Sequence, residues 1–139
     1  MENGVILDEQ ITASSEESSN HAAHQGRVHL FGAWTAYVDD LHQWLQVDTG
    51  SLYTKVTRVA TQGRHAPGTN QWVTMYKLQY GSNGVHFRYY REQGQTTNKV
   101  GSQGDKPLSM VFTSDANRRK YKCKHNNSYF DLKTVLTQA

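Results

Sequence analysis

Three successive segments between Gln43 and Gly84 alternate apolar and polar residues, and this periodicity constrains the fold more than any other feature of the chain. The segments read QWLQVDTG, KVTRVATQGR and WVTMYKLQYGSNG, and each closes with turn-forming residues. A period of two places successive side chains on opposite faces of a strand, which a helix cannot do. A further alternating run begins at Val85, directly after the glycine-containing turn, and predicts a β-hairpin. The pattern therefore predicts an antiparallel, all-β protein.

Several motifs occur in an order that resembles one protein family. They are ENGVILDEQITASS, GRVHLFGAW, QWLQVDTG, VTRVATQGR and WVTMYKLQYGSNGVHF, and they span residues 2–100. Together they resemble the discoidin domain, also called the coagulation factor V/VIII type C domain. The resemblance implies a galactose-binding-like jelly roll, an eight-stranded β-sandwich without a catalytic centre. It also implies that a ligand binds to loops at one end of the sandwich.

The resemblance ends near Val100, and the chain divides there into two parts. Residues 1–100 form the discoidin-like domain and hold eight Lys/Arg against nine Asp/Glu, whereas the divergent residues 101–139 hold seven against three. The cysteine with which the family's domain opens is missing, so the disulfide that joins its two ends cannot form, and Cys123 is the only cysteine. We therefore expect a discoidin-like jelly roll with incomplete or altered C-terminal strands.

The basic C-terminal segment contains two strand-like patterns, Pro107–Thr113 and Tyr129–Leu136. We expect Pro107–Thr113 to pair with the sheet, because alternate apolar residues share one strand face. The run RRKYKCKH at Arg118–His125 is interpreted as a solvated tail rather than a nucleic-acid-binding patch, and Arg118–Asn127 is expected to stay mobile. The alternative is that the whole segment is unrelated sequence added by altered splicing or a change of reading frame.

The resemblance implies that three loops, Ser15–Gln25, Thr35–His42 and Arg64–Gln71, gather at one end of the sandwich. Family members that insert into membranes containing phosphatidylserine carry bulky apolar residues at the tips of the first and third loops. Here the first loop reads SEESSNHAAHQ, so it has no large apolar residue, and its two glutamates would be repelled by an anionic surface. Membrane insertion and anionic-phospholipid binding are therefore disfavoured.

Carbohydrate recognition fits these loops better. Carboxylate, amide, guanidinium and imidazole groups can bond to sugar hydroxyls, while an aromatic ring lies against the apolar face of the sugar. The candidate ligand-binding residues are Tyr37, Asp39, Asp40, Arg64, His65 and Asn70. An equally weighted interpretation is that Asp39 and Asp40 cap a turn while Arg64 pairs with a surface carboxylate. A protein ligand at the same loops stays open as a further alternative.

No catalytic residues are predicted, because the sequence shows no nucleophile–base pattern, phosphate-binding loop or flanking pair of carboxylates. The short-spaced histidine and cysteine pairs lack the further ligands that a zinc site requires. No cofactor is expected, although calcium held by Asp39 or Asp40 is left open, since hard cations prefer oxygen ligands.

The supply of apolar residues is lean for a sandwich, and much of it is aromatic. Hydrophobic residues make up 36% of the chain, mean hydropathy is −0.77, and there are eight Tyr, four Phe and three Trp. Trp34, Trp44 and Trp72 lie in strand patterns rather than at loop tips. They are therefore predicted to have core or sheet-packing roles rather than to stack on a ligand.

These observations predict a non-enzymatic recognition or cell-adhesion module that binds a glycan or an extracellular protein and does not bind nucleic acid. By resemblance it acts outside the cell or on its surface. No signal sequence precedes the domain, so we interpret Met1 as an internal methionine of a larger, multidomain protein. The alternative is a truncated or alternatively spliced product that has no binding activity because its sandwich is incomplete.

Overall fold

The structure, a computed structural model, consists of strands and single turns of 3₁₀ helix. It describes residues 6–28, 31–50, 56–66, 69–71, 73, 75–81, 83–91, 94–97, 100–102, 108–111, 120–125 and 133–138. Over these ranges there are eleven strands, and the three 3₁₀ turns are η1 (Asp8–Gln10), η2 (Ser19–His21) and η3 (Ala23–Gln25). In this part of the chain no helix has the length and apolar character needed to cross a bilayer.

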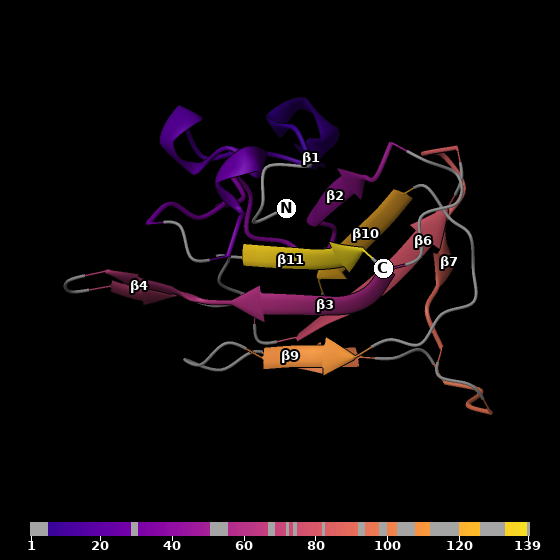
Figure 1. Cartoon of the computed structure of the whole chain (residues 1–139). Coiled ribbons are helices and arrows are strands. Elements are labelled where there is room, and N and C mark those ends of the chain that lie inside the picture. The colour runs from indigo at the N-terminus through magenta and orange to yellow at the C-terminus, as the bar shows by residue number, and fades with distance from the viewer. Residues whose placement is uncertain are drawn as a thin grey trace.

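One layer of the molecule is a six-stranded antiparallel sheet in the order β1-β2-β10-β6-β7, with β8 also paired to β6 (Figure 1). The predicted strands around Trp44 and Tyr76 are confirmed as β2 and β6, and the predicted hairpin joins β6 to β7. The strands of this sheet are β1 (Ile11–Ala13), β2 (Trp44–Asp48), β6 (Met75–Gly81), β7 (Arg88–Tyr89), β8 (Val100–Ser102) and β10 (Lys120–His125).

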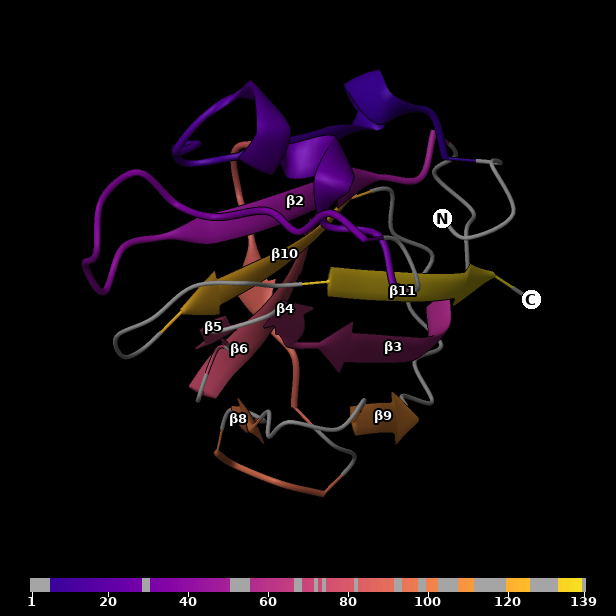
Figure 2. The same ribbon diagram turned by 90° about the vertical axis from the view of Figure 1, so that its left-hand side faces the viewer.

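A smaller sheet in the order β11-β3-β9 forms the second layer (Figure 2). It consists of β3 (Val56–Gln62), β9 (Leu108–Val111) and β11 (Lys133–Gln138). A separate two-stranded hairpin, β4 (Arg64–Ala66) and β5 (Thr69–Gln71), extends from the end of β3. The third predicted loop is therefore mostly a hairpin, because the pairing of Arg64 with Gln71 satisfies backbone groups that an open loop would leave to water.

The core lies between the two sheets, so the arrangement is the predicted β-sandwich. Leu45 and Leu78 of the larger sheet and Val59 of the smaller one belong to a single buried cluster. Thr61 of β3 is also buried, and its Oγ1 donates a hydrogen bond of 3.4 Å to the hydroxyl of Tyr76 on β6. This contact satisfies a polar group inside an otherwise apolar layer.

The C-terminal segment supplies three strands, which confirms one expectation and corrects another. The predicted pairing of Pro107–Thr113 is confirmed, because β9 lies within it and pairs with β3. The predicted strand at Tyr129–Leu136 is observed as β11, displaced towards the C terminus. The interpretation of Arg118–His125 as a solvated, mobile tail is wrong for Lys120–His125, which form β10 between β2 and β6.

The basic run forms a central strand because its charges also alternate. Tyr121 and Cys123 occupy register positions beside the buried Val47 and Leu45 of β2, whereas the lysines alternate with them. High charge in a segment therefore does not prevent it from forming a central strand.

The two tryptophans that the structure describes differ in burial, and both agree with the predicted core or sheet-packing roles. Trp34 is 2% exposed, and its Nε1 donates a hydrogen bond of 2.8 Å to the carbonyl oxygen of Ser15. Trp44 is only partly buried, because Leu45 and Val47 take the core face of β2 and leave Trp44 on the outer face. Trp72 lies outside the described residues.

Candidate functional site

The segments Ser15–Gln25 and Thr35–His42, together with the β4–β5 hairpin, are called the loop end here. In Figure 1 the hairpin projects on the left, beyond the end of β3, and Figure 2 looks onto that side. Figure 2 shows the loop before β2 and the β4–β5 hairpin on this same side of the molecule. The gathering of all three loops at one end stays an implication of the family resemblance.

Backbone hydrogen bonds fasten the first two loops of the loop end to each other. The amide of Glu17 donates a hydrogen bond of 2.9 Å to the carbonyl oxygen of Thr35. The amide of Thr35 donates one of 3.1 Å to the carbonyl oxygen of His21. The amide of Tyr37 donates to Oγ of Ser15 at 3.1 Å. Segments that are distant in sequence therefore form one hydrogen-bonded unit.

Gln43 is only 4% exposed to solvent, and its side chain connects the first two loops in the interior. Its Oε1 accepts hydrogen bonds of 2.6 Å from the hydroxyls of Ser14 and Ser15, and its Nε2 donates one of 2.8 Å to Oδ1 of Asp40. A buried amide is costly unless its polar atoms are paired, and these contacts pair both ends of the side chain. The sequence predictions missed Gln43, because its role depends on partners from two other segments.

Asp40 caps the turn that leads into β2. Its Oδ1 accepts from the amide of His42 at 2.7 Å as well as from Gln43. The hydrogen bond from the His42 backbone, followed by that from the Gln43 side chain, lowers the pKa of the Asp40 carboxyl. These contacts agree with the turn-capping interpretation, and a role of Asp40 in ligand binding stays a prediction.

Tyr37 and Asp39 are exposed on the loop that Asp40 caps. The Tyr37 side chain is 74% exposed, although its backbone is fixed to Ser15. The sequence analysis missed three exposed apolar residues in and near this loop, Phe31, Val38 and Leu41. Apolar tips were expected only on the first and third loops. The run YVDDL on the second loop is the sequence feature that indicates Val38 and Leu41.

The β4–β5 hairpin brings two candidate residues together. His65 of β4 and Asn70 of β5 are direct cross-strand partners. Arg64 is the cross-strand partner of Gln71 in the same hairpin. The six predicted site residues thus fall into a loop group of three and a hairpin group of three.

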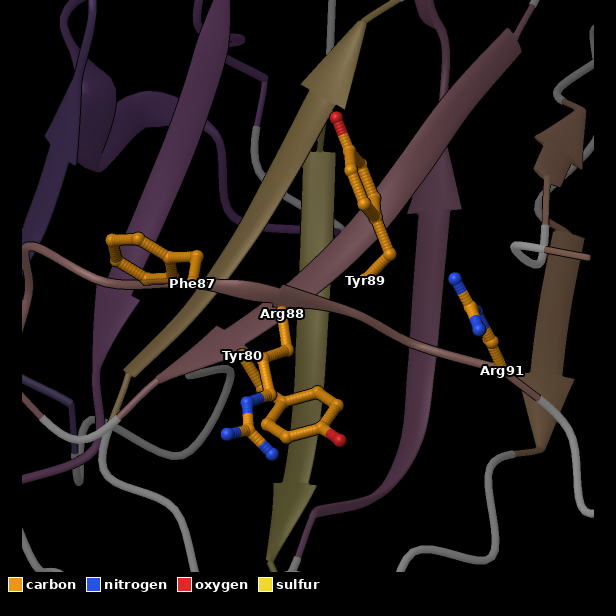
Figure 3. A pocket seen from close by; sticks show the side chains of 5 residues that line it. All are labelled: Tyr80, Phe87, Arg88, Tyr89 and Arg91. Carbon is orange, nitrogen blue, oxygen red and sulfur yellow. The ribbon is translucent and has the colours of Figure 1, made fainter.

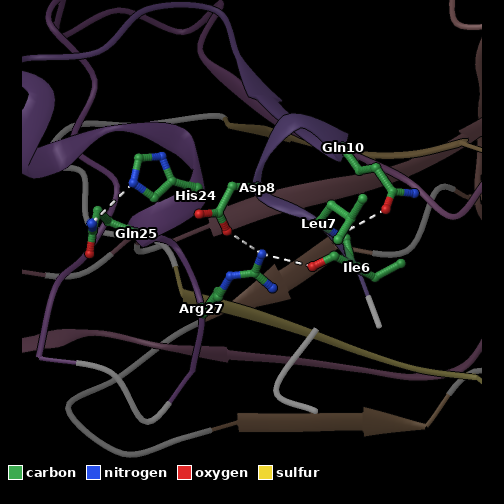
Figure 4. A network of polar contacts seen from close by, with 7 residues as sticks. All are labelled: Ile6, Leu7, Asp8, Gln10, His24, Gln25 and Arg27. Carbon is green, nitrogen blue, oxygen red and sulfur yellow. Dashed lines mark hydrogen bonds and ion pairs between the residues drawn. The ribbon is translucent and has the colours of Figure 1, made fainter. Parts of the chain in front are cut away.

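A second polar network joins the segment around η1 to Arg27 and to the end of β2 (Figure 4). Nη2 of Arg27 donates to the backbone oxygen of Ile6 at 2.8 Å and forms an ion pair of 2.5 Å with Asp8. Gln10 accepts from the Leu7 amide and donates to the carbonyl oxygen of Asp48 on β2, each at 2.8 Å. The hydrogen bond from Arg27 lowers the pKa of Asp8, so this network is strongest when Asp8 is ionised.

The geometry offers little to a metal ion. Among the described residues, no group of three or more His, Cys, Asp or Glu side chains is placed to hold one. Oδ1 of Asp40 is already engaged by two donors. A calcium ion at Asp39 or Asp40 stays a prediction without structural support.

A family model described as the F5/8 type C domain matches residues 10–116. The chain belongs to this family. The match continues past Val100 into the segment that contains β9. Domains of this family are binding modules rather than enzymes, so the coarse function of the chain is non-enzymatic recognition.

The curated relatives are much longer than this chain. It is 37% identical over 131 residues to the human EGF-like repeat and discoidin I-like domain-containing protein 3, covering 86% of this chain and 25% of that protein. It is 41% identical over 109 residues to rat lactadherin, covering 72% of this chain and 25% of that protein. The chain thus corresponds to about a quarter of each relative.

Solved structures share the fold at low sequence identity. Discoidin II of Dictyostelium discoideum superposes with a TM-score of 0.73 at 19% identity, covering 92% of this chain and 54% of that one. A family 32 carbohydrate-binding module of Clostridium perfringens NanJ was solved in complex with galactose. It superposes with a TM-score of 0.63 at 19% identity, covering 94% of this chain and 92% of that one. Together with the observed sheets, these similarities confirm the discoidin-like jelly roll.

Proposed function

We propose that the domain recognises a glycan through the loop end and does so outside the cell, as part of a longer adhesion or recognition protein. The observation that carries the proposal is the exposed ring of Tyr37 beside Asp39, on a loop held rigid from below by Ser15 and Gln43. An aromatic ring can lie against a sugar while neighbouring polar groups bond to its hydroxyls. A preformed loop also avoids the entropy cost of becoming ordered on binding.

The structural neighbours support the same class of ligand. The Clostridium perfringens module solved with galactose has the same fold, and a second module from that organism was solved with GalNAc-β-1,3-galactose. In the present chain, Tyr37 and Asp39 would supply the ring and the carboxylate, and the hairpin pair His65 and Asn70 would supply further polar groups. Asp40 would act indirectly, by fixing the shape of the loop.

Glycan-array binding of the full chain tests this site. Tyr37→Leu and Asp39→Ala should each remove most of the signal for the bound glycan, whereas Val85→Ala, an exposed position on the β6–β7 turn, should leave it unchanged. Cooperative thermal unfolding by near-ultraviolet circular dichroism must be retained by every variant, so that a loss of binding is not a loss of fold. Binding that survives both loop variants would refute the site.

A second candidate function is attachment to a lipid surface, and the observation that favours it is the exposure of Phe31, Val38 and Leu41. Apolar side chains on projecting loops gain free energy when they enter the membrane interface. Glu16 and Glu17 lie at the same end and would oppose an anionic surface, so zwitterionic vesicles are the favoured target.

Flotation with phosphatidylcholine vesicles tests the lipid hypothesis. Leu41→Ser should abolish flotation, and Leu7→Ser, which removes a comparably exposed leucine outside the loop end, should not. Flotation that requires phosphatidylserine, or that is unaffected by Leu41→Ser, would contradict attachment through these loops.

A further inference from the structure

A pocket of about 450 Å³ lies on the β6–β7 hairpin, away from the loop end. β7 is the last strand of the larger sheet, and Figure 1 shows it on the right, across the molecule from β4. The lining residues are shown in Figure 3 and are Tyr80, Phe87, Arg88, Tyr89 and Arg91. All five lining residues are aromatic or basic, and none of the candidate glycan-binding residues lines the pocket.

The hairpin register fixes the relative positions of these groups. Tyr80 is the cross-strand partner of Arg88, and in Figure 3 the two side chains lie next to each other on one side of the ribbon. Tyr89 points to the other side, where Nζ of Lys77 lies 5.8 Å from the centre of its ring. Arg88 is exposed and forms no ion pair with any residue that the structure describes.

The hairpin that carries the pocket is free of acidic residues. From Met75 to Arg91 the chain contains no Asp or Glu, and it contains three basic residues, Lys77, Arg88 and Arg91. Arg88 and Arg91 both line the pocket and bring positive charge to it. Positive charge in a concave site attracts anions.

We propose that this pocket binds an acidic saccharide, a sugar unit that carries a sulfate or a carboxylate. The fork of a guanidinium group matches the oxygens of either anion, and hydrogen bonds between charged partners are about twice as strong as neutral ones. The ring of Tyr80, which lies next to Arg88, offers apolar surface to the sugar itself. The volume of the pocket lies within the range of roughly 300 to 1,000 Å³ that is usual for small-ligand sites. This site is distinct from the loop end and does not depend on it.

Fluorescence anisotropy with labelled tetrasaccharides tests the proposal on the full chain. The probes are a heparin-derived tetrasaccharide with sulfates, a hyaluronan tetrasaccharide with carboxylates alone, and neutral chitotetraose. We expect one or both acidic probes to bind and chitotetraose not to bind at this site. Arg88→Gln and Arg91→Gln should each weaken binding about tenfold, the lower end of the effect of a charged hydrogen bond. Whichever acidic probe binds more tightly identifies the anionic group.

Two comparisons separate a pocket from a general attraction to positive charge. Arg64→Gln removes the same charge from the β4–β5 hairpin and should leave binding of the acidic probe unchanged. Tyr80→Phe should retain binding, whereas Tyr80→Leu should weaken it, because only the former keeps the ring beside Arg88. A single-stranded oligonucleotide of equal charge should compete poorly.

Three results would overturn the proposal. They are an absence of binding to both acidic probes, an equal loss of affinity in Arg64→Gln and Arg88→Gln, and equally strong competition by the oligonucleotide. The glycan-array test of Tyr37→Leu reports only on the loop end, so failure of either site can be recognised without the other. Circular dichroism of Arg88→Gln and Arg91→Gln verifies that the fold is intact.

Discussion

The loop end and the β6–β7 edge use their polar groups in opposite ways. At the loop end, Ser15 and Gln43 are 28 residues apart in sequence and bond to each other, and Gln43 then binds Asp40. At the β6–β7 edge, the strands belong to one hairpin, and its exposed Arg88 forms no ion pair with any described residue. Loops assembled from distant segments need side chains to hold their shape, whereas a hairpin is held by its backbone and leaves side chains for a ligand.

The two regions also differ in charge. Four of the chain's acidic residues, Glu16, Glu17, Asp39 and Asp40, belong to the loop end, and the β6–β7 hairpin from Met75 to Arg91 has none. A neutral glycan suits the first region, because its binding does not require positive charge, and an anion suits the second. The predictions below test this contrast in order of decreasing effect.

The largest effect is expected at the buried base of the loop end. Trp34→Ala should lower the free energy of unfolding by about 3 to 5 kcal/mol, because it removes a large buried side chain and the hydrogen bond to Ser15. Tyr37→Ala, on the exposed tip, should change it by less than about 0.5 kcal/mol. Urea unfolding measures both, and equal losses would show that the tip is as structural as the base.

Glycine substitutions should reveal a difference in rigidity between the two regions. A Cβ added at Gly81 would lie 2.3 Å from the backbone oxygen of His86, and one added at Gly32 would lie 2.3 Å from Oε1 of the Gln25 side chain. A side-chain amide can rotate away, whereas the hairpin backbone cannot. We expect Gly81→Ala to cost about 1 to 3 kcal/mol and Gly32→Ala less. The reverse order in thermal unfolding would show that the hairpin can open.

A smaller, pH-dependent effect is expected from Asp40. Its pKa is lowered in the folded state by the His42 amide and the Gln43 side chain, so ionised Asp40 stabilises the fold above the pKa of the unfolded chain. This contribution should be lost as the pH falls from about 4 through the folded pKa. Wild type should therefore exceed Asp40→Asn in stability at neutral pH and approach it in acid. Asp39→Asn is the matched control, and an equal effect there would implicate net charge instead.

The smallest effect concerns the cation above Tyr89. A double-mutant cycle with Lys77→Met and Tyr89→Leu should give a coupling energy of about 0.5 kcal/mol, the usual value for an exposed cation–π contact. Raising the salt concentration should reduce this coupling only slightly if the contact is local. A coupling of zero would show that Lys77 serves the positive surface and not the hairpin.

The sequence predicted the parts of the fold that are encoded by neighbours along the chain. β2, β3 and β6 follow from the alternation of apolar and polar residues, which is a local property. The β6–β7 hairpin follows from its turn, where Oδ1 of Asn83 accepts from the amides of Val85 and His86 and Gly84 has a φ of +74°. The ordered motifs also identified the family, which the match over residues 10–116 confirms.

Tertiary structure decided what depends on distant partners. The run KYKCKH alternates, yet only its place between β2 and β6 makes it a central strand rather than a basic tail. Gln43 was missed because the hydroxyls that it binds, those of Ser14 and Ser15, lie 29 and 28 residues away in the sequence. The physical reason is common to both: alternation specifies which face a side chain takes, but only contact between distant segments specifies what lies beside it.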